Sequence, residues 1–179
     1  MKVFQDLFAP SRTRVVGQAL YTSAARQSRQ PAFYARLGVA DSAEKRFELL
    51  TLHVALLLLR LKGQGEVATV IAQQVFDTFI QALDDALREM GVGDLSVGKK
   101  MRKLGEAFYG RAKAYDEAFA LAPDVSALQA LIGRTVLEDA ADPRAGPIAA
   151  YAVQALEGLR AQPLPDLLDG RAEWPQAPS

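Results

Sequence analysis

Hydrophobic residues along this chain recur every three or four positions, which is the spacing of one face of an α-helix. The stretch 66–90 shows the pattern clearly, with Val67, Ile71, Val75 and Phe79 on one stripe. No stretch alternates residue by residue, as a half-buried β-strand would. Combined with proline and glycine at the boundaries, the pattern predicts helices over residues 12–28, 31–38, 43–62, 66–90, 96–121, 123–138 and 147–161.

We therefore expect an all-α protein. A length of 179 residues suits one domain with a substantial core. We place a single-domain bundle of about five or six helices over residues 1–162. The remainder, residues 163–179, is rich in proline and lacks helical periodicity, so we expect it to be a mobile, flexible tail.

One predicted helix is apolar around nearly its whole circumference. Its middle reads LLTLHVALLLLRL, residues 49–61. The run is too short to span a bilayer of roughly 30 Å at about 1.5 Å per residue. Such a helix is either buried at the centre of the bundle or keeps one side for another chain.

Composition excludes several kinds of chemistry. The chain has no cysteine, so disulfides, thiolate catalysis and cysteine-ligated zinc are ruled out. A single histidine, His53, rules out sites built from two histidines of one chain. The net charge is zero, but residues 1–62 carry ten basic and four acidic residues and residues 63–95 carry one and six. These blocks suit either helices that pair across the bundle or a basic face that meets an acidic partner.

The stretch GDLSVGKK, residues 93–100, is similar to a phosphate-binding loop. Such a loop follows a buried strand, whereas the residues before Gly93 form an amphipathic helix. Lys100 also stands where the magnesium-binding hydroxyl belongs. We interpret the stretch as a turn between two helices, with Gly91 closing the first, Gly93 at a positive φ, and Asp94 or Ser96 capping the second.

Two longer blocks resemble one known family. The blocks FYARLGVADSAEKRFELLTLHVALLLLRLKGQG (33–65) and REMGVGDLSVGKKMRKLGEAFYGRAKAY (88–115) are similar to segments of the ubiquinol–cytochrome c chaperones, which are assembly factors of the cytochrome bc1 complex. The blocks and the helix between them cover roughly residues 30–120. The short N-terminus resembles bacterial members of the family.

The resemblance implies a protein without chemistry of its own that binds unassembled cytochrome b during biogenesis of the bc1 complex. It implies no cofactor and no specific nucleic acid. Further partners that it suggests are a small second assembly factor and a peripheral contact with the inner membrane or the ribosome. We expect a cytoplasmic protein, or one peripheral on the inner membrane, which would be the mitochondrial one in a eukaryote.

The two blocks also supply candidate partner-binding residues around an exposed apolar groove. These are Phe33, Tyr34, Arg36, Asp41, Phe47, His53, Arg88, Asp94, Tyr109 and Arg111. Alternatives stay open for three of them. His53 is either a core histidine, a partner contact or a haem ligand, and Phe33 and Tyr34 either pack the short helix on the bundle or edge the groove.

A basic cluster lies on the predicted helix 96–121, formed by Lys99, Lys100, Arg102 and Lys103. It is either a solvated face that complements acidic residues of the neighbouring helix or a contact for anionic lipid or ribosomal RNA. Two other functions remain as alternatives to the chaperone. One is a helical module that binds haem or quinone, and the other is an enzyme, for which no nucleophile–base or acid pair stands at a telling spacing.

Overall fold

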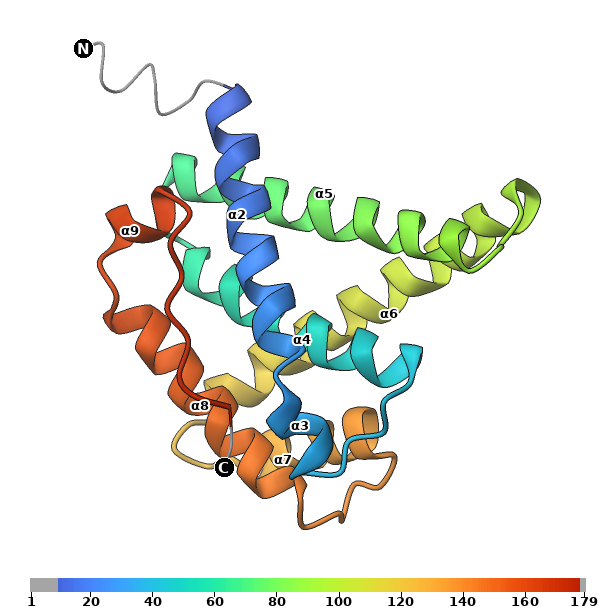
Figure 1. Ribbon diagram of the computed structural model, residues 1–179. Coiled ribbons are helices and arrows are strands. Elements are labelled where there is room, and N and C mark those ends of the chain that lie inside the picture. Colours follow the sequence, from blue (N-terminus) through green and yellow to red (C-terminus); the bar gives the residue numbers. More distant parts are fainter. Residues whose placement is uncertain (1–9, 178–179) are drawn as a thin grey trace.

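The computed structural model describes residues 10–177, and every regular element in that part of the chain is a helix (Figure 1). The predicted all-α, single-domain fold is confirmed. The structure has α2 (Pro10–Ser28), α3 (Pro31–Ala35), α4 (Ala43–Leu61), α5 (Glu66–Glu89), α6 (Asp94–Ala120), α7 (Ser126–Ile132), the π-helical η1 (Gly133–Leu137), α8 (Ala145–Ala161) and α9 (Leu164–Leu168). The first and last residues of the predicted domain and tail, 1–9 and 178–179, lie outside the described residues.

Helix α4 is the centre of the fold. It contacts α2, α5, α6, α8 and η1, and Leu49, Leu52, Val54, Leu56 and Leu57 are fully buried. Ser42 caps its start by accepting a hydrogen bond from the backbone N–H of Lys45 at 3.2 Å. Burial on several sides therefore accounts for most of the apolar circumference of α4.

Helix α2 crosses α5 at very close range. A Cβ on Gly17 would lie 2.4 Å from Cβ of Gln74, so only glycine fits at this crossing. Val16, Leu20 and Ala24 of α2 are buried there. Val15, the apolar neighbour of Val16, is exposed, because α2 is covered on a narrower arc than its apolar residues occupy.

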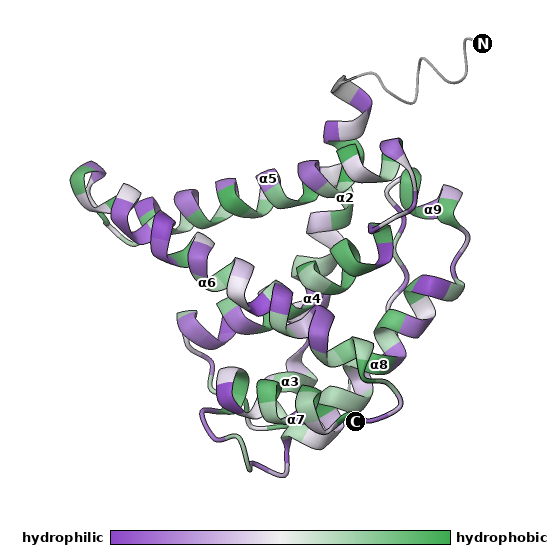
Figure 2. Ribbon diagram, turned by 180° about the vertical axis from the view of Figure 1, so that it is seen from behind, coloured by the Kyte–Doolittle hydropathy of each residue, from purple (hydrophilic) through white to green (hydrophobic). Residues whose placement is uncertain are grey.

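Helices α5 and α6 form a hairpin whose turn projects away from the rest of the molecule (Figure 1). Figure 2 shows hydrophobic and hydrophilic residues alternating along both helices. A turn between two helices is present, as the sequence predicted, but it is shorter: α5 ends at Glu89 and α6 already begins at Asp94, so most of the stretch 93–100 is helical. The details differ: Gly91 has a φ of +80°, whereas Gly93 has a φ of −68° and no side chain caps α6. One left-handed residue is enough to reverse the chain here.

The predicted helix 123–138 is present in two parts, α7 and the π-helix η1. Gly133 lies where they join, and a Cβ there would stand 2.4 Å from the carbonyl oxygen of Asp139. Lys45 holds this junction to α4. Its Nζ donates to the carbonyl oxygen of Thr135 at 3.2 Å and pairs with Glu138 at 2.8 Å.

The prediction of a flexible tail is wrong for residues 164–177. Leu167 of α9 is fully buried, and Leu164, Leu168, Ala172, Trp174 and Ala177 pack against the core. The segment after α9 runs back along α2 and α8 (Figure 1). The Gln162 side chain donates to the carbonyl oxygen of Arg171 and accepts from the N–H of Glu173. Apolar contacts and specific hydrogen bonds thus hold a proline-rich segment that composition alone assigns to solvent.

Candidate functional site

An apolar groove with a volume of about 570 Å³ lies between the C-terminal half of α4, the N-terminal half of α5 and the middle of α6. Its apolar walls are Ala55, Leu58, Leu59, Leu61, Ala72, Phe76, Phe108, Tyr109 and Ala112. Its rim is formed by Lys62, Gly63, Thr69, Gln73, Lys113 and Asp116. Its lining is mainly apolar, and we take it as the candidate site.

Each of the three helices contributes an apolar surface that its neighbours leave partly uncovered. On α4, Leu56 and Leu57 are buried, while Leu58 and Leu59 are only partly covered. On α5, Ala72 and Phe76 lie one turn apart beside the buried stripe. Sustained apolar sequence on α4 therefore has a second consequence besides burial, because one side of its last two turns forms a groove wall.

An aromatic cluster leads from the core to the surface of the groove. The ring centroids of Phe79 and Phe108 lie 4.8 Å apart, and those of Phe76 and Phe108 lie 5.3 Å apart. Tyr109 stands outermost, 5.3 Å from Phe76 and 62% exposed. Phe47 joins the buried end at 6.2 Å from Phe79. Edge and tilted contacts of this kind hold the rings in place. The exposed ring of Tyr109 is therefore held in a defined position at the surface.

Both lysines of the rim are paired with carboxylates of α6. Lys62 Nζ lies 2.6 Å from Asp116 Oδ2, joining α4 to α6 across one end of the groove. Lys113 lies 3.8 Å from Glu117. The walls between them are hydrophobic, so the groove offers apolar surface with a neutralised polar rim. Such a surface suits a hydrophobic segment of another chain.

Arg111, a predicted partner-binding residue, is engaged within the fold. Its guanidinium donates two hydrogen bonds of 3.0 Å to the two carboxylate oxygens of buried Glu48 on α4. Hydrogen bonding to Glu48 raises the pKa of Arg111 above its ordinary value. Arg111 is about a third exposed and is absent from the groove walls. The ion pair fixes α6 against α4. It thereby helps to position Tyr109, the groove-wall residue two positions before Arg111.

Two more predicted residues, Phe33 and His53, lie in the core and present no surface to a partner in this structure. His53 Nδ1 donates to the carbonyl oxygen of Leu49 at 2.7 Å, and Nε2 accepts from the Tyr151 hydroxyl at 2.8 Å. The ring is packed by Phe33 and Trp174 at 5.7 and 5.4 Å. Burial lowers the pKa of His53 to about 4. Both ring nitrogens are used internally, as in the core-histidine interpretation.

Tyr34, Arg36, Asp41 and Phe47 also lie outside the groove walls. The Tyr34 hydroxyl donates to the carbonyl oxygen of Ser28 at 3.2 Å, which ties α3 to the end of α2. Asp41 accepts hydrogen bonds from Arg46 at 2.6 and 3.0 Å, and these lower its pKa. Arg36 is exposed. The first family-like block therefore supplies α4 to the groove, while Tyr34 ties α3 to α2 and Asp41 pairs with Arg46 near the start of α4.

Arg88 and Asp94 meet at the far end of the α5–α6 hairpin. Arg88 donates to Asp84 at 2.6 Å and to Asp94 at 2.5 Å, and these hydrogen bonds raise the pKa of Arg88. The basic residues Lys99, Lys100, Arg102 and Lys103 are all exposed on the same part of α6. Of the predicted residues, Tyr109 thus lines the groove and His53 lies in the core, whereas Arg88, Asp94 and the basic cluster lie at the end of the hairpin.

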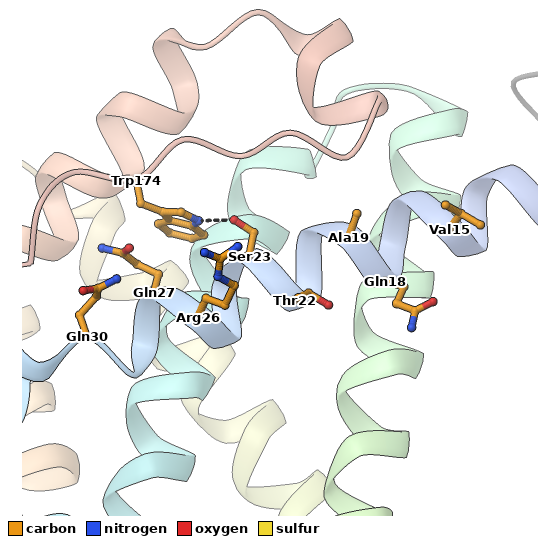
Figure 3. A pocket seen from close by; sticks show the side chains of 9 residues that line it. All are labelled: Val15, Gln18, Ala19, Thr22, Ser23, Arg26, Gln27, Gln30 and Trp174. Carbon is orange, nitrogen blue, oxygen red and sulfur yellow. Dashed lines mark hydrogen bonds between the residues drawn. The ribbon is translucent and has the colours of Figure 1, made fainter.

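A second, more polar pocket of about 560 Å³ lies along α2 (Figure 3). Gln18, Thr22, Arg26 and Gln27 line it, and Trp174 closes one end, where its indole Nε1 donates to Ser23 Oγ at 2.9 Å. Among the described residues, no group of three or more histidine, cysteine, aspartate or glutamate side chains could hold a metal ion. In the same residues, no helix is long and apolar enough to cross a membrane.

Sequence reasoning named Tyr109 and the stretch 49–61 but missed Phe76 and Ala112. Phe76 belongs to a second apolar stripe of α5, formed with Ala72, Ile80 and Leu83. This stripe lies beside the one formed by Val67, Ile71, Val75 and Phe79. Two adjacent stripes make an apolar arc wider than one neighbouring helix covers, and that width was the available signal.

Comparison with known proteins gives relatives over most of the chain. The model of the ubiquinol-cytochrome C chaperone family matches residues 35–174. The ubiquinol-cytochrome-c reductase complex assembly factor 1 of Xenopus laevis is 23% identical over 131 residues, covering 73% of this chain and 64% of the frog protein. The factor of the same name from Mus musculus is 24% identical over 168 residues, covering 91% of this chain and 56% of the mouse protein.

The chain therefore spans less than two thirds of the length of these two relatives. A solved structure matches more completely. The crystal structure of the Cbp3 homolog from Brucella abortus has a TM-score of 0.86 and 32% sequence identity to this chain, covering 99% of this chain and 98% of that one. The groove-forming helices α4, α5 and α6 all lie within the part that the family model matches.

Proposed function

Because this chain belongs to the ubiquinol-cytochrome C chaperone family, we propose that it is a non-enzymatic assembly factor of the cytochrome bc1 complex that holds unassembled cytochrome b in the α4–α5–α6 groove. The names of the curated relatives describe assembly factors of ubiquinol-cytochrome c reductase, and we assign the same role to this chain by similarity. The exposed, apolar groove is the observation that carries the proposal.

An unassembled membrane protein has apolar helices that water does not tolerate. A factor that holds such a client needs hydrophobic surface that is accessible before the client arrives. Leu58, Leu59 and Tyr109 supply this surface, and their backbone lies on long helices. An amphipathic or apolar helix docks in such a groove with residues at intervals of three and four.

Binding energy at such sites usually concentrates in a few aromatic anchors. Tyr109 has the exposure for this role, and Phe76 supports it from below at 5.3 Å. The paired rim of Lys62 and Asp116 places a polar boundary beside the apolar walls, a pattern common to protein interfaces. We therefore expect the groove to capture the client through hydrophobic contacts. Release follows when the client packs against the other subunits of its complex.

The proposal includes the place of action, which is the surface of the inner membrane, where the client is made and assembled. The alternative of a haem- or quinone-binding module receives no support from His53. Its two ring nitrogens are occupied by Leu49 and Tyr151, and it lies outside the groove.

Photocrosslinking in cells that assemble the bc1 complex tests this function. A photoreactive amino acid replaces Tyr109 in one variant and Leu59 in another, and matched controls carry it at exposed Leu121 and Val15, outside the groove. We expect adducts with cytochrome b from positions 59 and 109 that disappear when cytochrome b synthesis is blocked. Equal adducts from all four positions, or none from the groove, would refute the proposal.

A further inference from the structure

The tip of the α5–α6 hairpin carries two exposed hydrophobic side chains. Leu95 is 101% exposed and Met90 is 61% exposed. They flank the turn at Gly91, which projects away from the body of the molecule (Figure 1). Most large apolar residues of the helices are buried in the core. Exposure of both Met90 and Leu95 at one protruding end therefore suggests a surface that contacts a partner.

The same end carries four exposed cations. Lys99, Lys100, Arg102 and Lys103 are exposed, and none forms an ion pair with another described residue. The nearby carboxylates of Asp84 and Asp94 are occupied by Arg88. The remaining acidic groups of this region are Asp85 and Glu89 on α5 and Glu106 on α6.

These charges separate onto different sides of the hairpin. Asp85 and Glu89 lie four residues apart on α5, both opposite buried Leu87. Leu95, Lys99 and Arg102 follow one another at helical spacing on the outer side of α6, opposite buried Val97. The hairpin therefore presents an acidic side on α5 and a mainly basic side on α6, where Leu95 is exposed and Glu106 lies one turn beyond Arg102.

From this arrangement we propose that the tip docks on an anionic lipid surface, with Leu95 and Met90 entering the interface and the four cations contacting lipid phosphates. Basic residues beside an exposed apolar side chain suit a bilayer with anionic headgroups, which attracts cations and accepts apolar groups. The acidic side of α5 is repelled by such a surface and orients the hairpin with α6 toward it. This inference rests on the proposed function, since it names the surface through which the factor reaches its client.

Vesicle binding by the full-length protein tests the proposal. The probes are vesicles of phosphatidylcholine with and without 30 mol% phosphatidylglycerol, about three parts in ten, a content chosen to provide negative surface potential. The native chain has no cysteine, so a single Leu95→Cys variant can carry a polarity-sensitive dye. We expect a blue shift of its emission on anionic vesicles and none on neutral ones, and no shift with the dye at exposed Gln154 of α8.

Charge reversal supplies the decisive comparison. One variant carries Lys99→Glu, Lys100→Glu, Arg102→Glu and Lys103→Glu. Its matched control reverses the exposed residues Arg14, Arg29, Arg134 and Arg160, which changes the net charge equally. The tip variant should bind anionic vesicles at least about tenfold more weakly than the native protein, while the control stays much closer to it. Met90→Ser with Leu95→Ser should also weaken binding, unlike Val15→Ser with Leu121→Ser.

Equal binding of the native protein to neutral and anionic vesicles would overturn the proposal. Equal losses of vesicle binding in the tip variant and in its control would also overturn it. So would a tip variant that no longer binds a short RNA but still binds anionic vesicles like the native protein. The substituted residues are exposed, and circular dichroism verifies that each variant is folded. Failure of this proposal is distinguishable from failure of the proposed function. Tip variants should still capture a detergent-solubilised cytochrome b segment, whereas groove variants should still bind vesicles.

Discussion

Arg111 of α6 donates two hydrogen bonds of 3.0 Å to the carboxylate of Glu48 on α4. This bidentate ion pair joins two helices that belong to the two family-like blocks. Glu48 is buried and Arg111 is about a third exposed. The relationship assigns Arg111 to the support of the groove, because two of its N–H groups hold the buried Glu48 carboxylate.

We predict that Arg111→Ala destabilises the protein by about 3 kcal/mol, since the buried Glu48 carboxylate loses its partner. For a chain of this size, the melting temperature should fall by roughly 6–12 °C. Combining Arg111→Leu with Glu48→Leu should recover most of the loss, because no charge is then left buried. Thermal unfolding followed by circular dichroism measures both variants. An unchanged melting temperature in Arg111→Ala would contradict a structural role.

His53 predicts a dependence of stability on pH. Its folded pKa is lowered to about 4 by burial, below an unfolded value of about 6.5. Stability is therefore complete above about pH 6.5, where both states are neutral, and is lost as pH falls toward 4, because the unfolded chain binds the proton first. At pH 5 the loss should be about 2 kcal/mol relative to pH 7.

Urea unfolding of the native protein and of His53→Asn at pH 7 and pH 5 measures this effect. Carboxylates titrate in both proteins, so the difference between them isolates His53. The native protein should lose about 2 kcal/mol more than the variant. Parallel losses would show that His53 takes up its proton as easily in the fold as in the unfolded chain.

Trp174 is the only tryptophan of the chain, and it packs 5.4 Å from His53. We predict that its emission is blue-shifted and poorly quenched by acrylamide until the protein unfolds. Trp174→Ala should destabilise the fold by about 1–3 kcal/mol, because it removes a half-buried ring and the hydrogen bond to Ser23. Gln176→Ala, at an exposed position of the same segment, should change little. Strong quenching in the native protein would support the flexible tail that the structure contradicts.

The helices could be predicted from sequence because their signals are local. Periodicity, the cap at Ser42 and the glycine at Gly91 act within a few residues. The packed C-terminal segment could not be predicted, since its order comes from distant partners such as Ser23 and Gln27. Proline-rich composition describes the unbound segment, and tertiary contacts override it.

The candidate site was accessible to sequence reasoning only in part. Tyr109 was named from its block, and its exposure agrees with that choice. An all-apolar α4 does not reveal which of its sides remains uncovered, so Leu58 and Leu59 could not be separated from Leu56 and Leu57. Arg111 has the residue type of an interface anchor, but its partner Glu48 lies 63 positions away along the chain. Pairing at that separation has no local sequence signal.

The groove distinguishes two tyrosines that sequence reasoning treated alike. Tyr34 donates to Ser28 and lies outside the groove walls, whereas Tyr109 lies on them. We predict that Tyr34→Ala lowers the melting temperature and leaves client capture unchanged once the lower stability is taken into account. Crosslinking yield at a temperature where each variant is fully folded measures capture. A loss of capture at full folding would extend the client site to α3.

Binding of the client by the α4–α5–α6 groove is tested most directly by an affinity measurement. The full-length protein is titrated with an apolar helical segment of cytochrome b in mild detergent, and the native protein is compared with Tyr109→Ala. Tyr109 is 62% exposed, so its melting temperature should hardly change, while truncating the anchor should weaken binding by about 1–2 kcal/mol, or roughly 5–30-fold. Leu121→Ala, 55% exposed and outside the groove, is the matched control and should bind like the native protein. Equal affinity of Tyr109→Ala and the native protein would contradict the assignment of this groove as the client site.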